Sequence, residues 1–247
     1  MSDFPAVLRH WRKTRRFSQL ALALDADVSA RHISFLETGR ARPSRDMIGR
    51  LGEAMDLPLV AKNELLSHAG FAPRYSARDW EDEELAPIRE AVDYMLASHD
   101  PYPGLALNRL WKIVAFNTAG ARLYGGLGIG IGDSLLDLLQ SGQLSAMVEN
   151  WPAVARAATA RLRVESAAAG GIAELDRAID SLSGADAPGQ IDGPVVPTII
   201  RLGDMRLSMF ATIAQLGTPE DLTLDDLKVE LYFPADEVTK SFFESAI

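Results

Sequence analysis

The sequence predicts a multi-domain chain of the class α + α/β, in which an all-α domain of five helices precedes an α+β domain with a five-stranded antiparallel sheet. Three observations predict it. The length of 247 residues suits two modest domains. Apolar residues recur at helical spacing in the first part of the chain and at strand spacing in several segments after residue 104. The charge also changes sign, because residues 1–75 carry 12 Lys+Arg against 8 Asp+Glu, whereas residues 76–247 carry 13 against 26.

The composition is that of an ordinary globular protein, with 47% apolar and 24% charged residues. Cysteine is absent, which excludes disulfides and thiolate metal sites and fits a reducing compartment. The N-terminal segment lacks the apolar stretch of a signal peptide, and no segment approaches the roughly 18 apolar residues of a membrane helix. We therefore expect a cytoplasmic protein that does not enter a membrane.

Two short helices separated by a three-residue turn are expected between residues 18 and 38. Ser18 is a typical N-cap residue for the first helix and Ser29 for the second. In the second helix Ile33 and Leu36 share one face, and Gly39 supplies the left-handed conformation that ends it. This arrangement is that of a helix-turn-helix, whose second helix lies in the major groove of DNA.

Three further helices complete the first domain. One precedes the helix-turn-helix at residues 4–14. A fourth helix is capped by Ser44 and stopped before Pro58, and a fifth covers residues 60–69. Turn chemistry follows, so the expected domain comprises residues 1–73. Its net charge of +4, from the counts above, allows it to approach phosphate, while the acidic remainder of the chain is repelled.

The candidate DNA contacts lie on the polar side of the second helix of the motif and in the loop after it. Arg31 is the strongest candidate for reading a base, because a guanidinium donates two parallel hydrogen bonds to guanine. Gln19 begins its helix, where its amide can meet a phosphate or a base edge. The basic run from Arg12 to Arg16 is either a solvated helix end or a phosphate contact. The expected DNA-binding residues are Gln19, Ser29, Ala30, Arg31, His32, Ser34, Arg40 and Arg42.

Residues 74–103 are expected to connect the two domains. Leu85, Ile88, Val92 and Met95 recur at spacings of three and four, which predicts an amphipathic helix. The apolar stripe of this helix has to be buried. Packing on the second domain is the first interpretation, and pairing with the same helix of another subunit is the second.

The second domain, residues 104–247, is expected to contain the sheet. A turn at Gly203 and Asp204 predicts a hairpin between two of its strands. The expected strands are residues 105–108, 111–116, 197–203, 206–217 and 227–234. The expected helices begin at Asn117 or span residues 135–140, 143–168 and 172–182, and a later turn has Thr218 as N-cap and Pro219 as first helical residue. This order is that of a PAS-like domain, in which helices cover one face of the sheet.

One face of the sheet is expected to be apolar and to form the wall of a cavity. Met209 and Ile213 alternate with polar or smaller residues in one strand, and Leu231 and Phe233 do so in another. A solid core is the simpler interpretation for any single residue, but the whole set suits an elongated apolar ligand with a polar head. Arg201, if buried, needs an anion. The expected ligand-binding residues are Phe116, Asn117, Leu123, Tyr124, Leu135, Leu139, Met147, Trp151, Arg201, Met209, Phe210, Ile213, Leu231 and Phe233.

Both halves resemble known families. The pattern Ser18-Gln19, Leu22-Ala23, Val28-Ser29, Ile33, Leu36-Glu37 and Gly39 is similar to the lambda-repressor-like (XRE) helix-turn-helix family. The strings RHISFLETGRARPSRDM, PYPGLALNRLWKIVAFNTAGARLYG, VENWPAVARAATARLRVESAA and TIAQLGTPEDLTLDDLKVELYFPADE resemble the MmyB-like regulators, which carry a PAS-like ligand-binding domain behind the DNA-binding one. The glycine-rich GGLGIGIGD at residues 125–133 departs from that pattern and is expected to alter one wall of the pocket.

The motifs of several enzyme classes are missing. The glycines of residues 125–133 do not satisfy G-x-G-x-x-G and follow a helix instead of a strand. All four histidines precede residue 100, so the second domain has none for a base, a haem or a metal. We expect no catalytic residue, no metal and no cofactor other than a fatty-acid-like ligand. A sensor with a bound flavin-type cofactor and an enzyme with a DNA-binding leader domain remain as alternatives.

The expected function is therefore that of a bacterial-type transcription regulator. A single helix-turn-helix offers few base contacts, so we expect a homodimer bound to two half-sites of a double-stranded DNA operator. An apolar small molecule in the second domain is expected to change how the two helix-turn-helix units are spaced.

Overall fold

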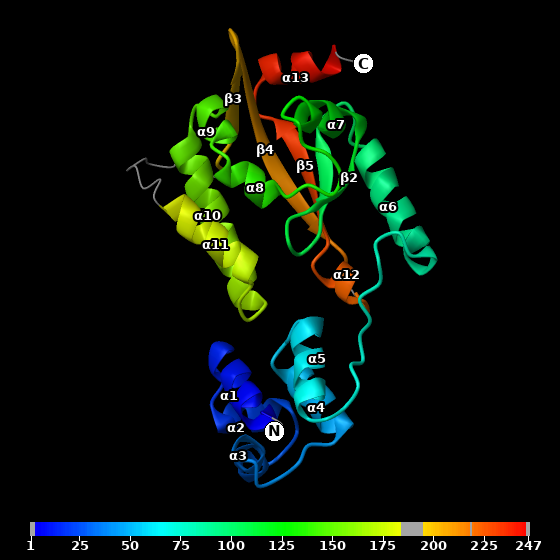
Figure 1. Ribbon diagram of the computed structural model, residues 1–247, viewed down its shortest axis with the longest axis vertical. Coiled ribbons are helices and arrows are strands. Elements are labelled where there is room, and N and C mark those ends of the chain that lie inside the picture. The colour runs from blue at the N-terminus through cyan, green and yellow to red at the C-terminus, as the bar shows by residue number, and fades with distance from the viewer. Residues whose placement is uncertain (1–2, 184–194, 218, 246–247) are drawn as a thin grey trace. The chain divides into compact units, whose positions relative to one another are not determined.

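The computed structural model describes residues 3–183, 195–217 and 219–245. Within these ranges the chain forms two compact units, and each is described by itself (Figure 1). The expected N-cap at Thr218 lies outside the described residues.

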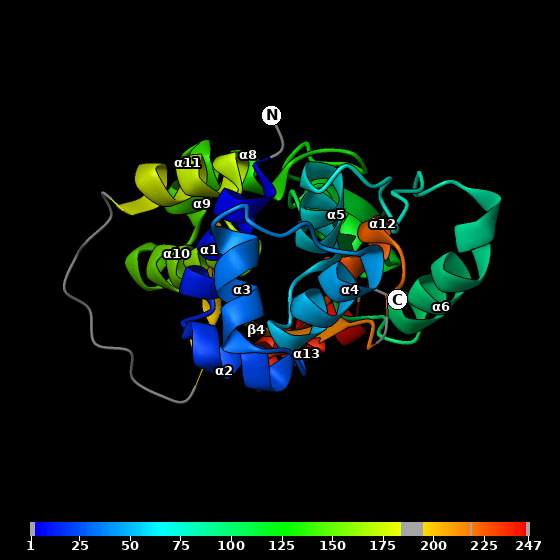
Figure 2. The same cartoon turned by 90° about the horizontal axis from the view of Figure 1, so that it is seen from below.

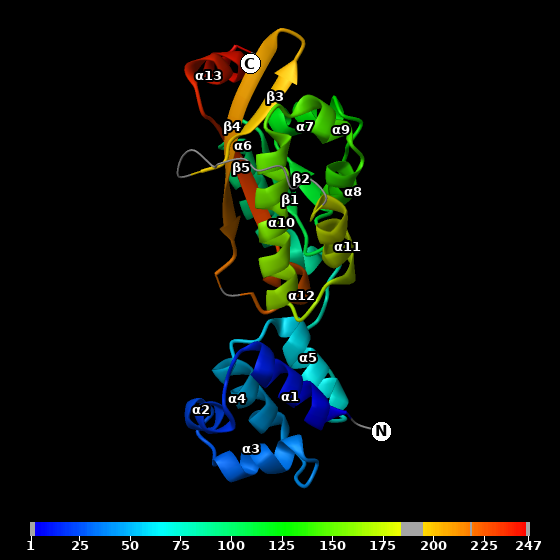
Figure 3. The same ribbon diagram turned by 90° about the vertical axis from the view of Figure 1, so that its left-hand side faces the viewer.

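The first unit comprises residues 1–77 with the short segments 167–171 and 220–225. Residues 3–77 contain five helices around one apolar core, in which Leu8 and Ile33 are fully buried. Figures 2 and 3 show these helices joined by short turns. In chain order they are α1 (Phe4–Thr14), α2 (Gln19–Asp25), α3 (Ala30–Glu37), α4 (Arg45–Ala54) and α5 (Leu59–His68).

Local capping accounts for where the helices of this unit begin and end. The hydroxyl oxygens of Ser18, Ser29 and Ser44 each accept a hydrogen bond of 3.0–3.1 Å from the backbone N–H three residues later. These bonds satisfy amide groups that have no partner inside the helix. After α3, Gly39 adopts the left-handed conformation with φ of +72°. The three expected caps and the glycine stop are therefore confirmed.

The second unit is built on a five-stranded antiparallel sheet, as expected. Its strands are β1 (Gly104–Leu107), β2 (Ile113–Phe116), β3 (Thr198–Leu202), β4 (Met205–Gln215) and β5 (Lys228–Pro234). The strand order is β2-β1-β5-β4-β3, so β5 is central and pairs with β1 on one side and β4 on the other. The short β3–β4 connection at Gly203 and Asp204 forms the expected hairpin.

Helices cover both faces of the sheet, whereas the sequence predicted helices on one face. The segment from the expected connector forms α6 (Ala86–Ala97), which packs on β1, β2 and β5. The opposite face carries α7 (Thr118–Gly125), α8 (Leu135–Gln140), α9 (Gln143–Met147), α10 (Trp151–Ala168) and α11 (Ala173–Leu182). Figures 1 and 3 show α6 on one side of the sheet and α8 to α11 on the other. Two short helices, α12 (Leu222–Asp225) and α13 (Glu237–Glu244), flank β5 in the chain.

The packing of α6 confirms the first interpretation of its apolar stripe, with one shift in register. Val92 and Leu96 are almost fully buried, while Met95 is 37% exposed. Leu96 replaces Met95 because it lies four residues after Val92 and therefore on the same helix face. The leucine side chain fits against the glycine backbone of β1, since a Cβ added to Gly104 would lie only 3.0 Å from it.

Three expected boundaries were wrong. The helix expected over residues 143–168 is broken after α9, because Val148 leaves the helix to form an antiparallel bridge with Ile200. Trp111 is not in a strand; it has a left-handed backbone with φ of +58°, and β2 begins two residues later. Pro219 does not begin a helix, since α12 begins at Leu222. In all three cases contacts from outside the segment decide the conformation.

A glycine in α7 limits how closely this helix packs on β1. A Cβ added to Gly120 would lie 2.4 Å from the carbonyl oxygen of Gly104, which is backbone and cannot move aside. We expect Gly120→Ala to lower the free energy of unfolding by about 1–3 kcal/mol, as overpacking does. Gly125→Ala is the matched control, because a Cβ there meets nothing within 4 Å. Thermal unfolding followed by circular dichroism checks this, and equal midpoints for the two variants would contradict it.

Candidate functional site

The first candidate site is the outer surface of α3. Ile33 and Leu36 point into the core and are fully buried, so the remaining positions of the helix face outward. Arg31 is exposed, and its guanidinium lies 5.1 Å from the centre of the Phe35 ring. This cation–π contact supports the arginine on the helix surface. Figure 2 shows α3 along the surface of the unit, with α2 crossing near one of its ends.

The structure brings most of the expected DNA-binding residues onto this surface. Ser29, Arg31, Arg40 and Arg42 are exposed, and Ala30, His32 and Ser34 are half-buried on α3. The two loop arginines follow the C-terminal end of the helix, where phosphate-contacting cations are commonly found. Ser29 has a structural role as well, since its hydroxyl caps the helix.

Arg12 and Gln19 are engaged inside the first unit. The carboxylate of Glu37 is buried and accepts hydrogen bonds from Arg12 at 2.6 and 3.0 Å and from the Gln19 amide at 2.7 Å. Arg12 is therefore neither a solvated helix end nor a free phosphate contact. The Gln19 amide nitrogen, expected to meet DNA, instead donates to Glu37. Sequence spacing does not reveal this cluster, because its members come from α1, α2 and α3.

The charge of Glu37 is held by its neighbours. Burial alone would raise the pKa of this carboxyl, but the hydrogen bonds from Arg12 and Gln19 and the charge of Arg12 outweigh it and lower the pKa. The same pairing raises the pKa of Arg12 above its ordinary value. The result is an ion pair that fastens α1 to the C-terminal end of the recognition helix.

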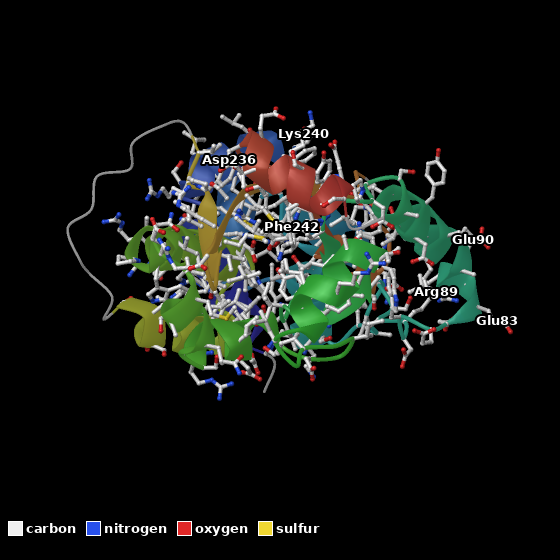
Figure 4. The ribbon with its side chains drawn as sticks, turned by 90° about the horizontal axis from the view of Figure 1, so that it is seen from above. Glu83, Arg89, Glu90, Asp236, Lys240 and Phe242 are labelled. Atoms are coloured by element: carbon white, nitrogen blue, oxygen red, sulfur yellow. The ribbon has the colours of Figure 1, made fainter. Side chains whose placement is uncertain are left out.

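The second candidate site is an apolar cavity of about 460 Å³ in the second unit, a volume within the usual range of ligand pockets. Residues of α7, α9, the sheet and α13 form its wall. Figure 4 shows Phe242 on the inner side of α13, whereas Lys240 points outward. The main lining residues are Leu123, Leu127, Leu144, Met147, Ile200, Leu207, Phe242 and Phe243. Gly126 and Leu127 come from the glycine-rich segment that was expected to alter one wall.

A second cavity of about 270 Å³ adjoins the first. The two share Leu123, Leu127, Leu144, Val148 and Ile200, so together they form one elongated chamber, named here the chamber. Three alanines help to leave the space open beyond this shared wall: Ala157, Ala158 and Ala211. The inner cavity is not purely apolar, since Trp111, Tyr124, Arg161, Glu230 and Tyr232 also line it.

Seven of the expected ligand-binding residues line the chamber. They are Leu123, Tyr124, Leu135, Leu139, Met147, Met209 and Ile213. The other seven are not among its lining residues. Phe116 stacks on Tyr124 at 5.5 Å, and Trp151 packs in the apolar cluster around Val148. Asn117 is buried, but its amide caps α7 and bonds the backbone of Gly104, Leu96 and Tyr102.

Arg201 does not face the chamber. Its side chain is 56% exposed and donates a 2.6 Å hydrogen bond to Glu149, which is the anion it requires. The expected buried cation on a strand was therefore wrong. In the hairpin β3–β4, Arg201 pairs directly with Arg206, and both interact with the same glutamate at the surface.

The strand register explains why Phe210, Leu231 and Phe233 are away from the chamber. Residues directly opposite in an antiparallel pair share a face. Phe210 pairs with Phe233 and stacks on it at 5.7 Å, whereas Ala211 of the chamber pairs with Tyr232. The apolar residues of β5 thus face α6, and its charged and hydroxyl residues face the chamber. The sequence prediction had assigned the opposite face.

Two further kinds of site were searched for among the described residues. No group of three or more His, Asp or Glu side chains there is placed to hold a metal ion. None of the described helices is long and apolar enough to cross a membrane.

A small helical unit with an exposed recognition helix, followed by a unit with an apolar chamber, defines a DNA-binding protein with a ligand-binding domain. Comparison with protein families identifies it further. Residues 3–65 match a helix-turn-helix domain, and residues 88–246 match the MmyB-like transcription regulator ligand binding domain. The chain belongs to this family of DNA-binding transcription regulators, as the resemblance implied. A comparison with curated proteins finds no match.

The Glu37 ion pair has a testable effect on stability. Because folding lowers the pKa of Glu37, its contribution is fully present above the ordinary carboxyl pKa and is lost as the pH falls through the lower value of the folded protein. We expect Glu37→Gln to lower the free energy of unfolding by about 1.5–3 kcal/mol near neutral pH. Urea unfolding over a pH series checks this, and the difference from the parent chain should shrink toward acid pH.

Asp46→Asn is the control for that measurement. Asp46 pairs with Arg50 at 3.5 Å, but its side chain is 84% exposed. Surface pairs of this kind contribute about 0–1 kcal/mol. Equal losses for both variants, or a Glu37→Gln effect that does not vary with pH, would contradict the assigned role.

Proposed function

We propose that this regulator reads operator DNA with α3 and is controlled by an elongated, fatty-acid-like small molecule bound in the chamber. The observation that carries the DNA half is the division of α3 between buried Ile33 and Leu36 and exposed Arg31. A helix anchored in this way presents its outer side to the major groove without rearrangement of the core.

Arg31 is the residue proposed to read a base. Its contact with Phe35 holds the guanidinium near the helix surface, so less side-chain freedom is lost when it forms two hydrogen bonds to a guanine. Arg40 and Arg42 are proposed to contact phosphates, which position the helix but do not read sequence. The Glu37 cluster supports these contacts indirectly, because it fixes α3 against α1.

The ligand half of the proposal rests on the shape and lining of the chamber. Two adjoining cavities with a common apolar wall suit a long chain better than a compact molecule. The mouth and the inner end carry polar groups, and the middle carries leucine, valine and isoleucine side chains. An acyl chain replaces water along such a wall with a gain of roughly 25 cal/mol for each Å² of apolar surface buried.

Control of DNA binding requires that the ligand favour one of two states of the protein. We propose that the regulator acts as a homodimer on two half-sites about one helical turn apart, and that ligand binding shifts the spacing of the two recognition helices. The chain would act by binding alone, without catalysing a reaction. Its place of action, as the sequence predicts, is the cytoplasm, where the operator is.

The division between base reading and phosphate contact is tested by two arginine variants. Arg31→Ala is expected to cost about 1–3 kcal/mol at one base position of each half-site and to relax preference there. Arg42→Ala is expected to weaken all sequences alike and to reduce the salt slope by about 1 for each site contacted. Binding titrations across operator variants at several salt concentrations check this, and identical behaviour of the two variants would contradict it.

Occupation of the chamber is tested by filling its shared wall. Leu123 lines both cavities, so Leu123→Trp is expected to exclude a long ligand from the chamber. Native mass spectrometry followed by organic extraction should find an apolar molecule with the parent chain and much less of it with the variant. Val164→Trp is the control, because Val164 is 69% exposed and lines neither cavity. Equal recovery from both variants would contradict the proposed site.

A further inference from the structure

The inner end of the chamber contains a chain of hydrogen-bonded polar groups. The Tyr124 hydroxyl donates to the Tyr232 hydroxyl at 3.0 Å, and the Tyr232 hydroxyl donates to the Glu230 carboxylate at 3.1 Å. Burial raises the pKa of both tyrosines, so both hydroxyls keep their protons. Glu230 is 97% buried, since only 3% of its surface is exposed, and it lies on the central strand of the sheet.

Arg161 of α10 closes this end and is held rigidly. Its Nε donates to Glu165 at 2.8 Å, its Nη1 donates to Glu230 at 2.5 Å, and the Trp111 ring covers its guanidinium at 4.4 Å. The third nitrogen, Nη2, is buried and has no hydrogen-bond partner among the described residues. Burying such a donor without an acceptor is costly. Arg161 therefore presents one fixed, unused donor at the wall of the cavity.

The charges around Arg161 are already balanced. Glu165 accepts a second ion pair, from Lys228 at 2.8 Å, so two cations and two carboxylates form one cluster. Burial would lower the pKa of Arg161, but the two glutamates outweigh it and raise the pKa, so the guanidinium stays charged. Burial would raise the pKa of Glu165, and its two cationic partners outweigh it. Arg161 and Glu230 are the charged residues among those that line the inner cavity.

We propose that the inner cavity is a head-group subsite for an uncharged hydrogen-bond acceptor, such as the carbonyl oxygen of an ester, lactone, ketone or amide. Arg161 Nη2 donates to this oxygen, and the apolar remainder of the ligand extends past Leu123 into the outer cavity. The inference rests on the proposed function, because it specifies the class of ligand that the chamber takes. The ligand is fatty-acid-like in its chain, without an ionised carboxylate at this end.

A carboxylate is disfavoured at this position for an electrostatic reason. The cluster is neutral, so an added anion would be buried beside Glu230 with only one free donor nitrogen to compensate for its lost hydration. A neutral carbonyl needs one donor and brings no charge. A site that offers one buried donor also discriminates against ligands that lack an acceptor, since the donor is then left without a partner.

The preference is tested by calorimetry on the full chain, freed of ligand by organic extraction and refolding. The two probes are methyl octanoate and nonanoate, which have the same number of non-hydrogen atoms and differ in the charge of the head. Methyl octanoate is expected to bind the parent chain at least about tenfold more tightly at neutral pH, a difference of about 1.4 kcal/mol. Tighter binding of nonanoate would overturn the inference and leave the proposed function standing.

Two variants test whether Arg161 and the charge balance cause that preference. Arg161→Lys keeps the positive charge but removes the third nitrogen, and it is expected to weaken methyl octanoate at least about tenfold. Arg163→Lys, two residues later on the exposed side of α10, is the control and should bind like the parent. Glu230→Gln leaves the cluster with a net positive charge, so it should shift the preference toward nonanoate about tenfold.

The outcomes separate this inference from the proposed function. Preference for the ester, lost in Arg161→Lys and reversed toward nonanoate in Glu230→Gln, supports the subsite. Equal effects of Arg161→Lys and Arg163→Lys would overturn it, even if the ester binds. If Arg161→Lys fails to fold, the Glu230→Gln comparison decides alone, because a purely structural role of the cluster would not change which head group is preferred. No binding of either probe would overturn both the subsite and the apolar-ligand proposal.

Discussion

The second unit depends on the neutralisation of charges that its central strand buries. Lys228 and Glu230 lie on β5 with only 4% and 3% of their surfaces exposed, and β5 pairs with strands on both sides. Isolated buried charges are prohibitive, so α10 has to lie where Arg161 and Glu165 can pair with them. This requirement sets which face of the sheet the helices of the chamber cover. The apolar alternate residues of β5 then face α6.

The first unit contains a similar constraint on a smaller scale. Glu37 is buried at the end of the recognition helix and requires Arg12 of α1 and Gln19 of α2 as partners. Buried ion pairs add little to stability compared with apolar packing, but removing one partner is costly. Their main effect here is on geometry: only one arrangement of α1, α2 and α3 satisfies all three polar groups. In that arrangement Arg31 remains on the outside of α3.

The two constraints have a common consequence for function. Each uses polar groups to fix the position of a helix while apolar groups provide the driving force, and each leaves one cationic donor unengaged by any anion. On α3 that donor is Arg31, which the proposed mechanism directs at DNA. In the chamber it is Arg161 Nη2, which the proposed mechanism directs at a ligand oxygen. A regulator of this family thus presents one positioned guanidinium to each of its proposed partners.

Local features of this protein were readable from the sequence. Residue types at the helix ends predicted the five helices of the first unit and the caps at Ser18, Ser29 and Ser44, because a cap involves only residues within one turn. Alternation along the strands and the turn residues predicted the five-stranded sheet and the β3–β4 hairpin. The buried side of α3 followed from the spacing of Ile33 and Leu36. Half of the expected ligand-binding residues, including Leu123, also line the chamber.

What the tertiary structure alone decided concerns faces and partners. Alternation in β5 shows which residues share a face, but not which layer that face meets, and two layers compete for the sheet. The chamber therefore received Glu230 and Tyr232, and α6 received Leu231 and Phe233. Likewise Arg12 and Arg161 look in sequence like surface cations. Their anions lie 25 and 69 residues away, and no local pattern reports a pairing at that distance.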